Sequence, residues 1–134
     1  MDLIADTTLL VGLWRRQAWA MSFAKANPGR CLGLPWVVLG EFWHGARRAG
    51  HDPALVRQFL ALGLPLLDPE PVIPAYAAIC TALQAHHPAA WRAIGHNDLW
   101  IAAAAVAHAK PLVSRNRRHF AHIDGLQVQA LGEE

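Results

Sequence analysis

The amino-acid sequence predicts an α/β protein in which a central parallel sheet lies between two layers of helices, an α/β/α arrangement. Short apolar runs typical of buried strands alternate along the chain with longer segments of helical periodicity. This alternation favours a parallel sheet covered on both faces. No repeat, low-complexity tract or long linker interrupts the 134 residues, so we expect a single domain over residues 1–134.

The first two strands and helices are expected in the first 50 residues. The run "LIADTTLLVGL" begins as a short strand that breaks at Asp6 and then becomes helical, with Thr7 or Thr8 as the N-cap. The run "CLGLPWVVLGEFWHGARRAG" predicts a very short strand and then a helix that starts near Pro35 and ends at Gly50.

The middle of the chain continues the alternation. Asp52 precedes a proline, which predicts a helix N-cap and a helix that runs to about Leu62. The run "LPLL" predicts a strand closed by Asp68, which also precedes a proline and resembles a helix cap. A longer helix is expected from about Val72 to His86.

The last third of the chain predicts one helix and two strands. An alanine-rich helix follows Gly95, "KPLVS" is the next strand, a short basic turn follows, and "LQVQAL" is the last strand. The longest apolar run is too short to span a bilayer, and no signal peptide is evident. Cys31 and Cys80 are isolated, as expected for buried, reduced thiols of a cytoplasmic protein.

The charged residues give a limited indication of the partner. The net charge of +2 does not by itself indicate nucleic-acid binding. Arginine predominates, however, because only Lys25 and Lys110 among the 12 cations are lysines. Arg115, Arg117 and Arg118 gather after the predicted "LVS" strand and can bind phosphate groups in bidentate fashion. Solvated charge on an apolar protein is the alternative interpretation.

Most of the 10 carboxylates have an ordinary structural explanation. They are terminal, lie beside prolines or occupy a turn: Asp2, Asp52, Asp68, Glu70, Asp124, Glu133 and Glu134. Three acids remain, and each is surrounded by apolar residues. Asp6 ends the first predicted strand, Glu41 lies within the helix "WVVLGEFW", and Asp98 lies at the start of the alanine-rich helix. A buried acid needs a compensating cation or hydrogen-bond donor.

These three acids indicate a divalent-metal site. In an open α/β sheet, strand ends and helix N-termini at one edge form the ligand crevice. Asp6 belongs to that edge, Asp98 can belong to it, and Glu41 reaches it if its helix leans across the opening. Converging oxygen ligands without cations favour a hard divalent ion. Taken singly, Asp6 is also explained as a turn residue, Glu41 as a solvent-facing helix residue and Asp98 as a cap.

Four runs of the sequence together resemble a PIN-domain protein, specifically a VapC-like toxin ribonuclease of a type II toxin–antitoxin system. They are "LIADTTLLVGL", "VLGEFWHG", "IGHNDLWIAAAAVAHAKPLVSRNRRHF" and "IDGLQV", and they cover nearly the whole chain. The resemblance implies a single PIN-like α/β/α domain, a Mg²⁺- or Mn²⁺-dependent site that cleaves RNA, a homodimer, no membrane association and a cognate VapB-like antitoxin. Asp6, Glu41 and Asp98 fall on the family's acidic residues.

The resemblance also identifies supporting residues and departures from the family pattern. Thr7 and Ser114 are expected to support the acidic site. The family often has Asp as a fourth acid where this chain has Asn116, a neutral oxygen ligand that would hold a second metal ion more weakly. A turn residue is the alternative interpretation of Asn116. His119 stands where some relatives have another Asp.

The expected reaction is hydrolysis of phosphodiester bonds in RNA by metal-activated water. Asp6 and Asp98 are the expected direct metal ligands, and Glu41 binds the metal directly, binds through water, or helps to activate that water. A catalytically inactive PIN-like module that acts through RNA or partner binding is the alternative. A phosphatase-like or nucleotide-binding enzyme fits less well, because no glycine-rich phosphate loop follows the first strand.

Overall fold

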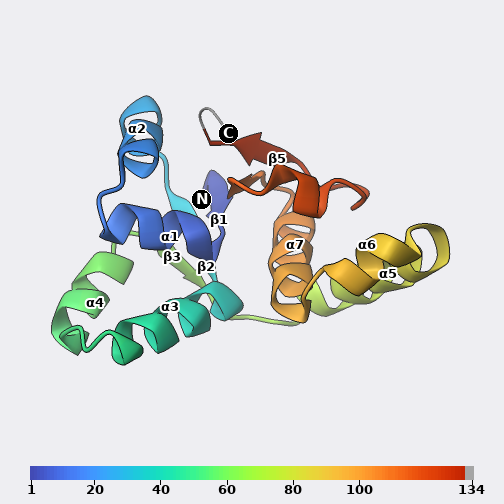
Figure 1. The fold of residues 1–134 in the computed structure, drawn as a ribbon, viewed down its shortest axis with the longest axis horizontal. Coiled ribbons are helices and arrows are strands. Elements are labelled where there is room, and N and C mark those ends of the chain that lie inside the picture. The colour runs from blue at the N-terminus through green and yellow to red at the C-terminus, as the bar shows by residue number, and fades with distance from the viewer. Residues whose placement is uncertain (132–134) are drawn as a thin grey trace.

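The computed structural model describes residues 1–131, so the last three residues of the predicted 1–134 domain lie outside the described residues. Within the described part, a sheet has five strands in the order β3-β2-β1-β4-β5 (Figure 1). Every neighbouring pair is parallel, which confirms the predicted sheet. The strands are β1 (Leu3–Ala5), β2 (Leu32–Pro35), β3 (Leu64–Leu66), β4 (Leu112–Ser114) and β5 (Val128–Ala130).

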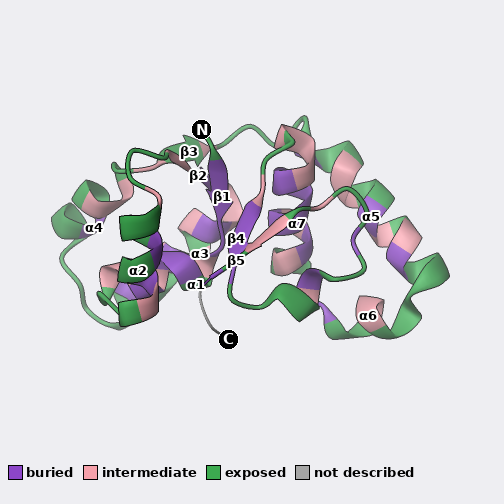
Figure 2. Cartoon of the chain, turned by 90° about the horizontal axis from the view of Figure 1, so that it is seen from above, coloured by how far each residue is buried: buried purple, intermediate pink, exposed green. Residues whose placement is uncertain are grey.

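Helices cover both sides of this sheet, as the α/β/α prediction requires. Those described are α1 (Thr7–Trp14), α2 (Ala18–Ala26), α3 (Trp36–Arg48), α4 (Pro53–Leu60), α5 (Val72–His86), α6 (Pro88–Ala93), α7 (His96–His108) and the short 3₁₀ helix η1 (Arg117–Phe120). In Figure 2, α1, α2 and α4 lie on one side of the strands, and α5, α6 and α7 lie on the other. Helix α3 contacts both α1 and α7.

The buried centre of the fold holds the strand ends from which the candidate site projects. All residues of β1 and β4 are buried, and these two strands are neighbours in the sheet. On α7, the residues from Ile101 to Ala105 are all buried. Burial of an aliphatic side chain contributes about 1.5–3 kcal/mol. The ends of β1 and β4 are therefore among the most firmly held parts of the chain.

Two helices were not predicted from the sequence, and both have weak apolar patterns. Helix α2 buries only Ala20 and Phe23, and it follows a turn in which Arg16 has a positive φ of 54°. Helix α6 begins at Pro88 and has no buried residue. Both lie on the surface, so neither needs the apolar stripe by which a packed helix is recognised.

Local capping differs from the sequence prediction at two positions. Asp6, and neither Thr7 nor Thr8, is the N-cap of α1. Asp68 does not cap a helix, because its side chain accepts a hydrogen bond from the backbone N–H of Glu70 in a turn before α5. Asp52 caps α4 as predicted, accepting from the backbone N–H two residues on.

The cysteines are free, as expected, but the prediction that they are buried was wrong. Cys31 and Cys80 are both partly exposed. In the part of the chain that the structure describes, no helix combines the length and the apolar character needed to cross a bilayer.

Candidate active site

The candidate site lies at the carboxyl ends of β1 and β4. Ala5 pairs with Val113 in the sheet register. The residues that follow this pair, Asp6 and Ser114, are therefore neighbours at the same edge. They are 7% and 0% exposed respectively, and they are the buried polar residues of the described core. Asp6 and Ser114 thus lie side by side at the sheet edge where the sequence predicted the ligand crevice.

Asp6 is a buried carboxylate that caps the first turn of α1. Its Oδ1 accepts a hydrogen bond of 2.9 Å from the backbone N–H of Leu9, which caps α1. Burial raises the pKa of Asp6, while the hydrogen bonds from the Ser114 hydroxyl and the Leu9 N–H lower it. The negative charges of Asp98 and Glu41 raise the same pKa further. Asp98 and Glu41 therefore lie close enough to Asp6 for their negative charges to act on it.

Glu41 is held in place by one residue from each neighbouring helix. The Thr7 hydroxyl at the start of α1 donates to Oε1 at 2.5 Å, and the Asn97 side-chain amide from α7 donates to Oε2 at 3.2 Å. Glu41 is only partly exposed on α3. Thr7 thus contacts one of the three acids, and its role in a catalytic site stays a prediction. Gly95 is the N-cap of α7, and the Asn97 side chain in the first turn of this helix contacts Glu41.

Asp98 lies in the first turn of α7 and contacts a histidine from η1. Its Oδ2 lies 2.8 Å from Nε2 of His119, and the side chains of His119 and Asp98 are 25% and 39% exposed. Asp98 does not cap α7, since the N-cap is Gly95 and no side-chain capping bond is present there. Sequence reasoning noted the position of His119 without assigning it a role.

Among residues 1–131, no lysine or arginine lies within ion-pair distance of any of the three acids, and His119 is the basic side chain that contacts one of them, Asp98. The charge of the acidic group is therefore not balanced by the protein's permanent cations. A bound divalent cation would lower the repulsion that raises the pKa of Asp6.

The donor set fits a divalent ion only in part. Within the described residues, no group of three or more His, Cys, Asp or Glu side chains is arranged to hold a metal ion. Both oxygens of Glu41 accept hydrogen bonds, and one oxygen of Asp98 contacts His119. Asp6 and Asp98 remain as oxygen donors. Mg²⁺ is commonly bound through one or two carboxylates, with water and substrate phosphates completing its shell, so this pair fits such an ion.

Asn116 makes the contacts of a turn residue. Its backbone N–H donates to the Ser114 hydroxyl at 3.0 Å, and its carbonyl accepts from the N–H of His119 at 3.2 Å. It is exposed, and it lines a cavity of about 440 Å³ together with Arg118 and His119. Its role as a metal ligand stays a prediction.

The basic residues after β4 are exposed and differ in how they are held. The guanidinium carbon of Arg115 lies 4.5 Å from the ring centroid of Trp19 on α2, which is a cation–π contact. Arg117 and Arg118 lie on η1. Arg115 is therefore fixed on the α2 side of the strand end, whereas Arg118 shares a cavity with His119.

The chain matches the PIN domain over residues 3–126 and therefore belongs to the PIN-domain family. This match agrees with the parallel sheet of the structure.

Its relatives are VapC-type proteins, as the sequence predicted. The chain is 29% identical over 130 residues to ribonuclease VapC4 of Mycobacterium tuberculosis. The aligned region covers 90% of this chain and 91% of that relative. The VapBC2 complex of Rickettsia felis, bound to a DNA fragment from its promoter, matches with a TM-score of 0.80 at 19% identity, covering 98% of this chain and 99% of that chain. VapBC-1 of nontypeable Haemophilus influenzae matches with a TM-score of 0.76 at 24% identity, covering 97% and 98%.

Proposed function

We propose that the chain is a divalent-metal-dependent endoribonuclease and the toxin of a toxin–antitoxin pair. The observation that carries this proposal is the buried carboxylate of Asp6, whose pKa is raised by burial and by the nearby charges of Asp98 and Glu41. No arginine or lysine of the described residues neutralises this group. Similarity to ribonuclease VapC4 supports RNA as the substrate.

In this proposal, Asp6 and Asp98 hold Mg²⁺ or Mn²⁺ at the carboxyl edge of the sheet. The bound ion supplies neutralisation of phosphate charge and a water of lowered pKa. Ser114 and the Leu9 N–H lower the pKa of Asp6 and so oppose part of the rise that burial causes. Glu41 is held by Thr7 and Asn97, and in this proposal it would bind the metal directly or through water, or help to activate that water.

The arginines next to this edge bind the phosphates on either side of the cleaved bond. Arg115 follows Ser114 directly and is fixed against Trp19, so less conformational freedom is lost when it binds a phosphate. Arg118 lines the cavity that also contains His119. Arg117 is exposed on the same 3₁₀ helix and contributes a more mobile positive charge.

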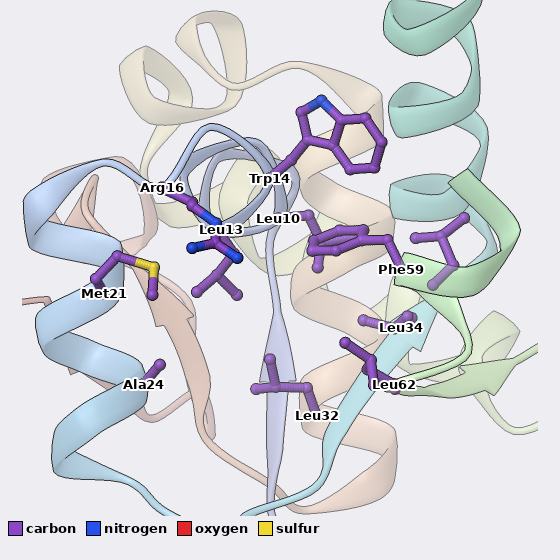
Figure 3. Close-up of a pocket in the computed structure, with 12 residues that line it drawn as sticks. Leu10, Leu13, Trp14, Arg16, Met21, Ala24, Leu32, Leu34, Phe59 and Leu62 are labelled. Atoms are coloured by element: carbon purple, nitrogen blue, oxygen red, sulfur yellow. The ribbon is translucent and has the colours of Figure 1, made fainter. Parts of the chain in front are cut away.

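The antitoxin binds an apolar groove at the other end of α1 (Figure 3). The groove has a volume of about 480 Å³ and lies between α1, α2 and α4. Its lining includes Leu10, Leu13, Trp14, Met21, Leu34, Phe59 and Leu62. Such a groove suits the apolar face of an amphipathic helix. The solved VapBC complexes that share this fold support a small antitoxin as the occupant.

The test is cleavage of a structured RNA by the antitoxin-free protein. We expect cleavage with Mg²⁺ or Mn²⁺, no cleavage with chelator, and a loss of more than about 100-fold in Asp6→Asn or Asp98→Asn. Removing partners that merely support a metal ligand already costs 10–100-fold, so loss of a direct ligand should cost more. Glu70→Gln, at an exposed acid in a turn, is the matched control and should cleave normally.

Wild-type protein that binds RNA without cleaving it at any Mg²⁺ or Mn²⁺ concentration would contradict the enzyme proposal. That result would favour the inactive binding module instead. Cleavage that survives both substitutions would contradict the assignment of the site.

A further inference from the structure

The contact between His119 and Asp98 sets Asp98 apart from the other two acids. Asp6 and Glu41 accept hydrogen bonds from hydroxyl, backbone and amide donors, whereas Asp98 faces an imidazole at 2.8 Å. An ionised carboxylate can only accept a hydrogen bond, so Nε2 of His119 carries the proton in this contact. The bond engages Oδ2 of Asp98 and leaves its other oxygen free of this donor.

His119 is itself held in place from two directions. Its backbone N–H donates to the carbonyl of Asn116 at 3.2 Å. Its ring lies edge-on to the ring of Phe120, with centroids 5.4 Å apart and an interplanar angle of 87°. Phe120 is only 4% exposed and belongs to the core. The fold of η1 therefore places the imidazole beside Asp98.

A series of contacts along the end of β4 and η1 links the two candidate metal ligands. Ser114 lies beside Asp6 at the strand ends and lowers its pKa, and the Ser114 hydroxyl accepts a hydrogen bond from the backbone N–H of Asn116. The Asn116 carbonyl accepts from the N–H of His119, and Nε2 of His119 donates to Asp98. The end of β4 and η1 thus connect Asp98 on α7 with Asp6 at the end of β1.

We propose that His119 is a positioning residue that orients the Asp98 carboxylate so that its free oxygen faces the divalent ion held with Asp6. This inference rests on the proposed function. A metal-binding carboxylate whose second oxygen is hydrogen-bonded loses rotational freedom, and such supporting partners typically change metal affinity by about 10–100-fold. The role requires a donor at the position of Nε2 and does not require an imidazole as such.

This requirement separates two amide substitutions. In His119→Gln, the side-chain amide nitrogen lies the same number of bonds from the backbone as Nε2. In His119→Asn, the amide nitrogen lies one bond closer to the backbone and falls short of Asp98. The two variants are alike in chemistry and differ in reach. His122→Ala is the histidine control, because His122 stacks on His87 with ring centroids 4.3 Å apart and makes no hydrogen bond to Asp98.

The experiment measures Mn²⁺ binding to the metal-free full chain by electron paramagnetic resonance of the free ion, without RNA. We expect His119→Asn and His119→Ala to weaken Mn²⁺ binding by about tenfold or more. We expect His119→Gln to stay within about threefold of wild type, and His122→Ala to match wild type. Metal-free melting temperatures of the same proteins identify any general loss of folding. Such a loss would affect His119→Gln and His119→Asn alike, whereas the proposed role separates these two variants.

Two results would overturn this inference while leaving the proposed function in place. One is wild-type Mn²⁺ affinity in His119→Asn and His119→Ala. The other is tighter binding in those variants, which would mean that His119 competes with the metal for Asp98. Absence of Mn²⁺ binding by the wild-type chain at millimolar concentrations would instead overturn the proposed function, and this inference with it.

Discussion

The two ends of helix α1 contribute to two very different surfaces. At its start, Asp6 and Thr7 join an acidic group held by individual hydrogen bonds, in which Thr7 donates to Glu41. At its end, Leu13 and Trp14 line an apolar groove of about 480 Å³. The first surface depends on the placement of single oxygen atoms, and the second depends on shape and apolar area. In the proposed function, this difference predicts that RNA cleavage and antitoxin binding can be disrupted separately, although one helix of 8 residues contributes to both surfaces.

A charge in the groove should abolish this apolar complementarity and leave the acidic end unchanged. Leu62 lines the groove and is 82% exposed, so Leu62→Glu should fold normally. We expect it to weaken antitoxin binding by about tenfold or more, because an unpaired carboxylate would be buried against apolar side chains. Titration with purified antitoxin measures the affinity, and RNA cleavage should stay at the wild-type rate.

Leu55→Glu is the matched control for this variant. Leu55 is 52% exposed on α4 and is not part of the groove lining, so the antitoxin affinity should not change. An equal loss of affinity in both variants would argue against the groove as the docking surface. A loss of cleavage in Leu62→Glu alone would contradict the separation of the two ends of α1.

Arg115 tests whether the acidic end is extended by a phosphate-binding surface. Arg115→Gln should raise KM for RNA by about tenfold or more with little change in kcat, since a hydrogen bond to a charged group contributes roughly 1.5–3 kcal/mol. Steady-state cleavage assays measure both constants. Arg57→Gln is the control, because Arg57 lies over Trp43 at 5.4 Å in a similar cation–π contact between α3 and α4. A fall in kcat at unchanged KM would contradict the proposed role.

The smallest expected effect concerns the stability of the metal-free protein. The pKa of Asp6 is raised in the folded state, mainly by burial. The folded state therefore binds this proton more tightly than the unfolded state, and stability falls as pH rises from the ordinary carboxyl pKa of about 3.9 through the raised value. Asp6→Asn removes this loss and keeps an N-cap of similar strength.

We accordingly expect Asp6→Asn to raise the metal-free Tm at neutral pH by a few °C and to flatten its fall from acid to neutral pH. About 1 kcal/mol corresponds to roughly 3–6 °C for a protein of this size. Thermal unfolding followed by circular dichroism across pH 4–8 measures this. A lower Tm for Asp6→Asn at neutral pH would mean that Asp6 serves mainly as a cap.

Much of the fold could be predicted because the central elements carry strong local signals. Alternating apolar runs located the five strands, and the bounds of the helix predicted from Val72 to His86 agree with α5. The predicted helix starts near Pro35 and Pro53 also agree with α3 and α4. Helices α2 and α6 were missed because they bury few residues and leave little apolar periodicity to detect.

The three acids could be selected from the sequence because each lies in an apolar context that does not explain it. Their hydrogen-bond partners could not be predicted in the same way. Asn97 contacts Glu41 across 56 positions of sequence, and His119 contacts Asp98 across 21. Such pairs depend on how α3, α7 and η1 pack, and no local pattern encodes them. His119 was visible only as a departure from the family pattern.

The central claim is that Asp6 and Asp98 bind the divalent ion. The most direct test is the Mg²⁺-dependent rise in Tm of the metal-free wild type compared with the double variant Asp6→Asn/Asp98→Asn. A ligand that binds only the folded state adds about 2.7 kcal/mol at 100 times its Kd. We predict a rise in Tm that grows with Mg²⁺ concentration in the wild type and in Glu70→Gln, and none in the folded double variant. If the Tm of the double variant rises with Mg²⁺ concentration as much as the Tm of the wild type does, the account is contradicted.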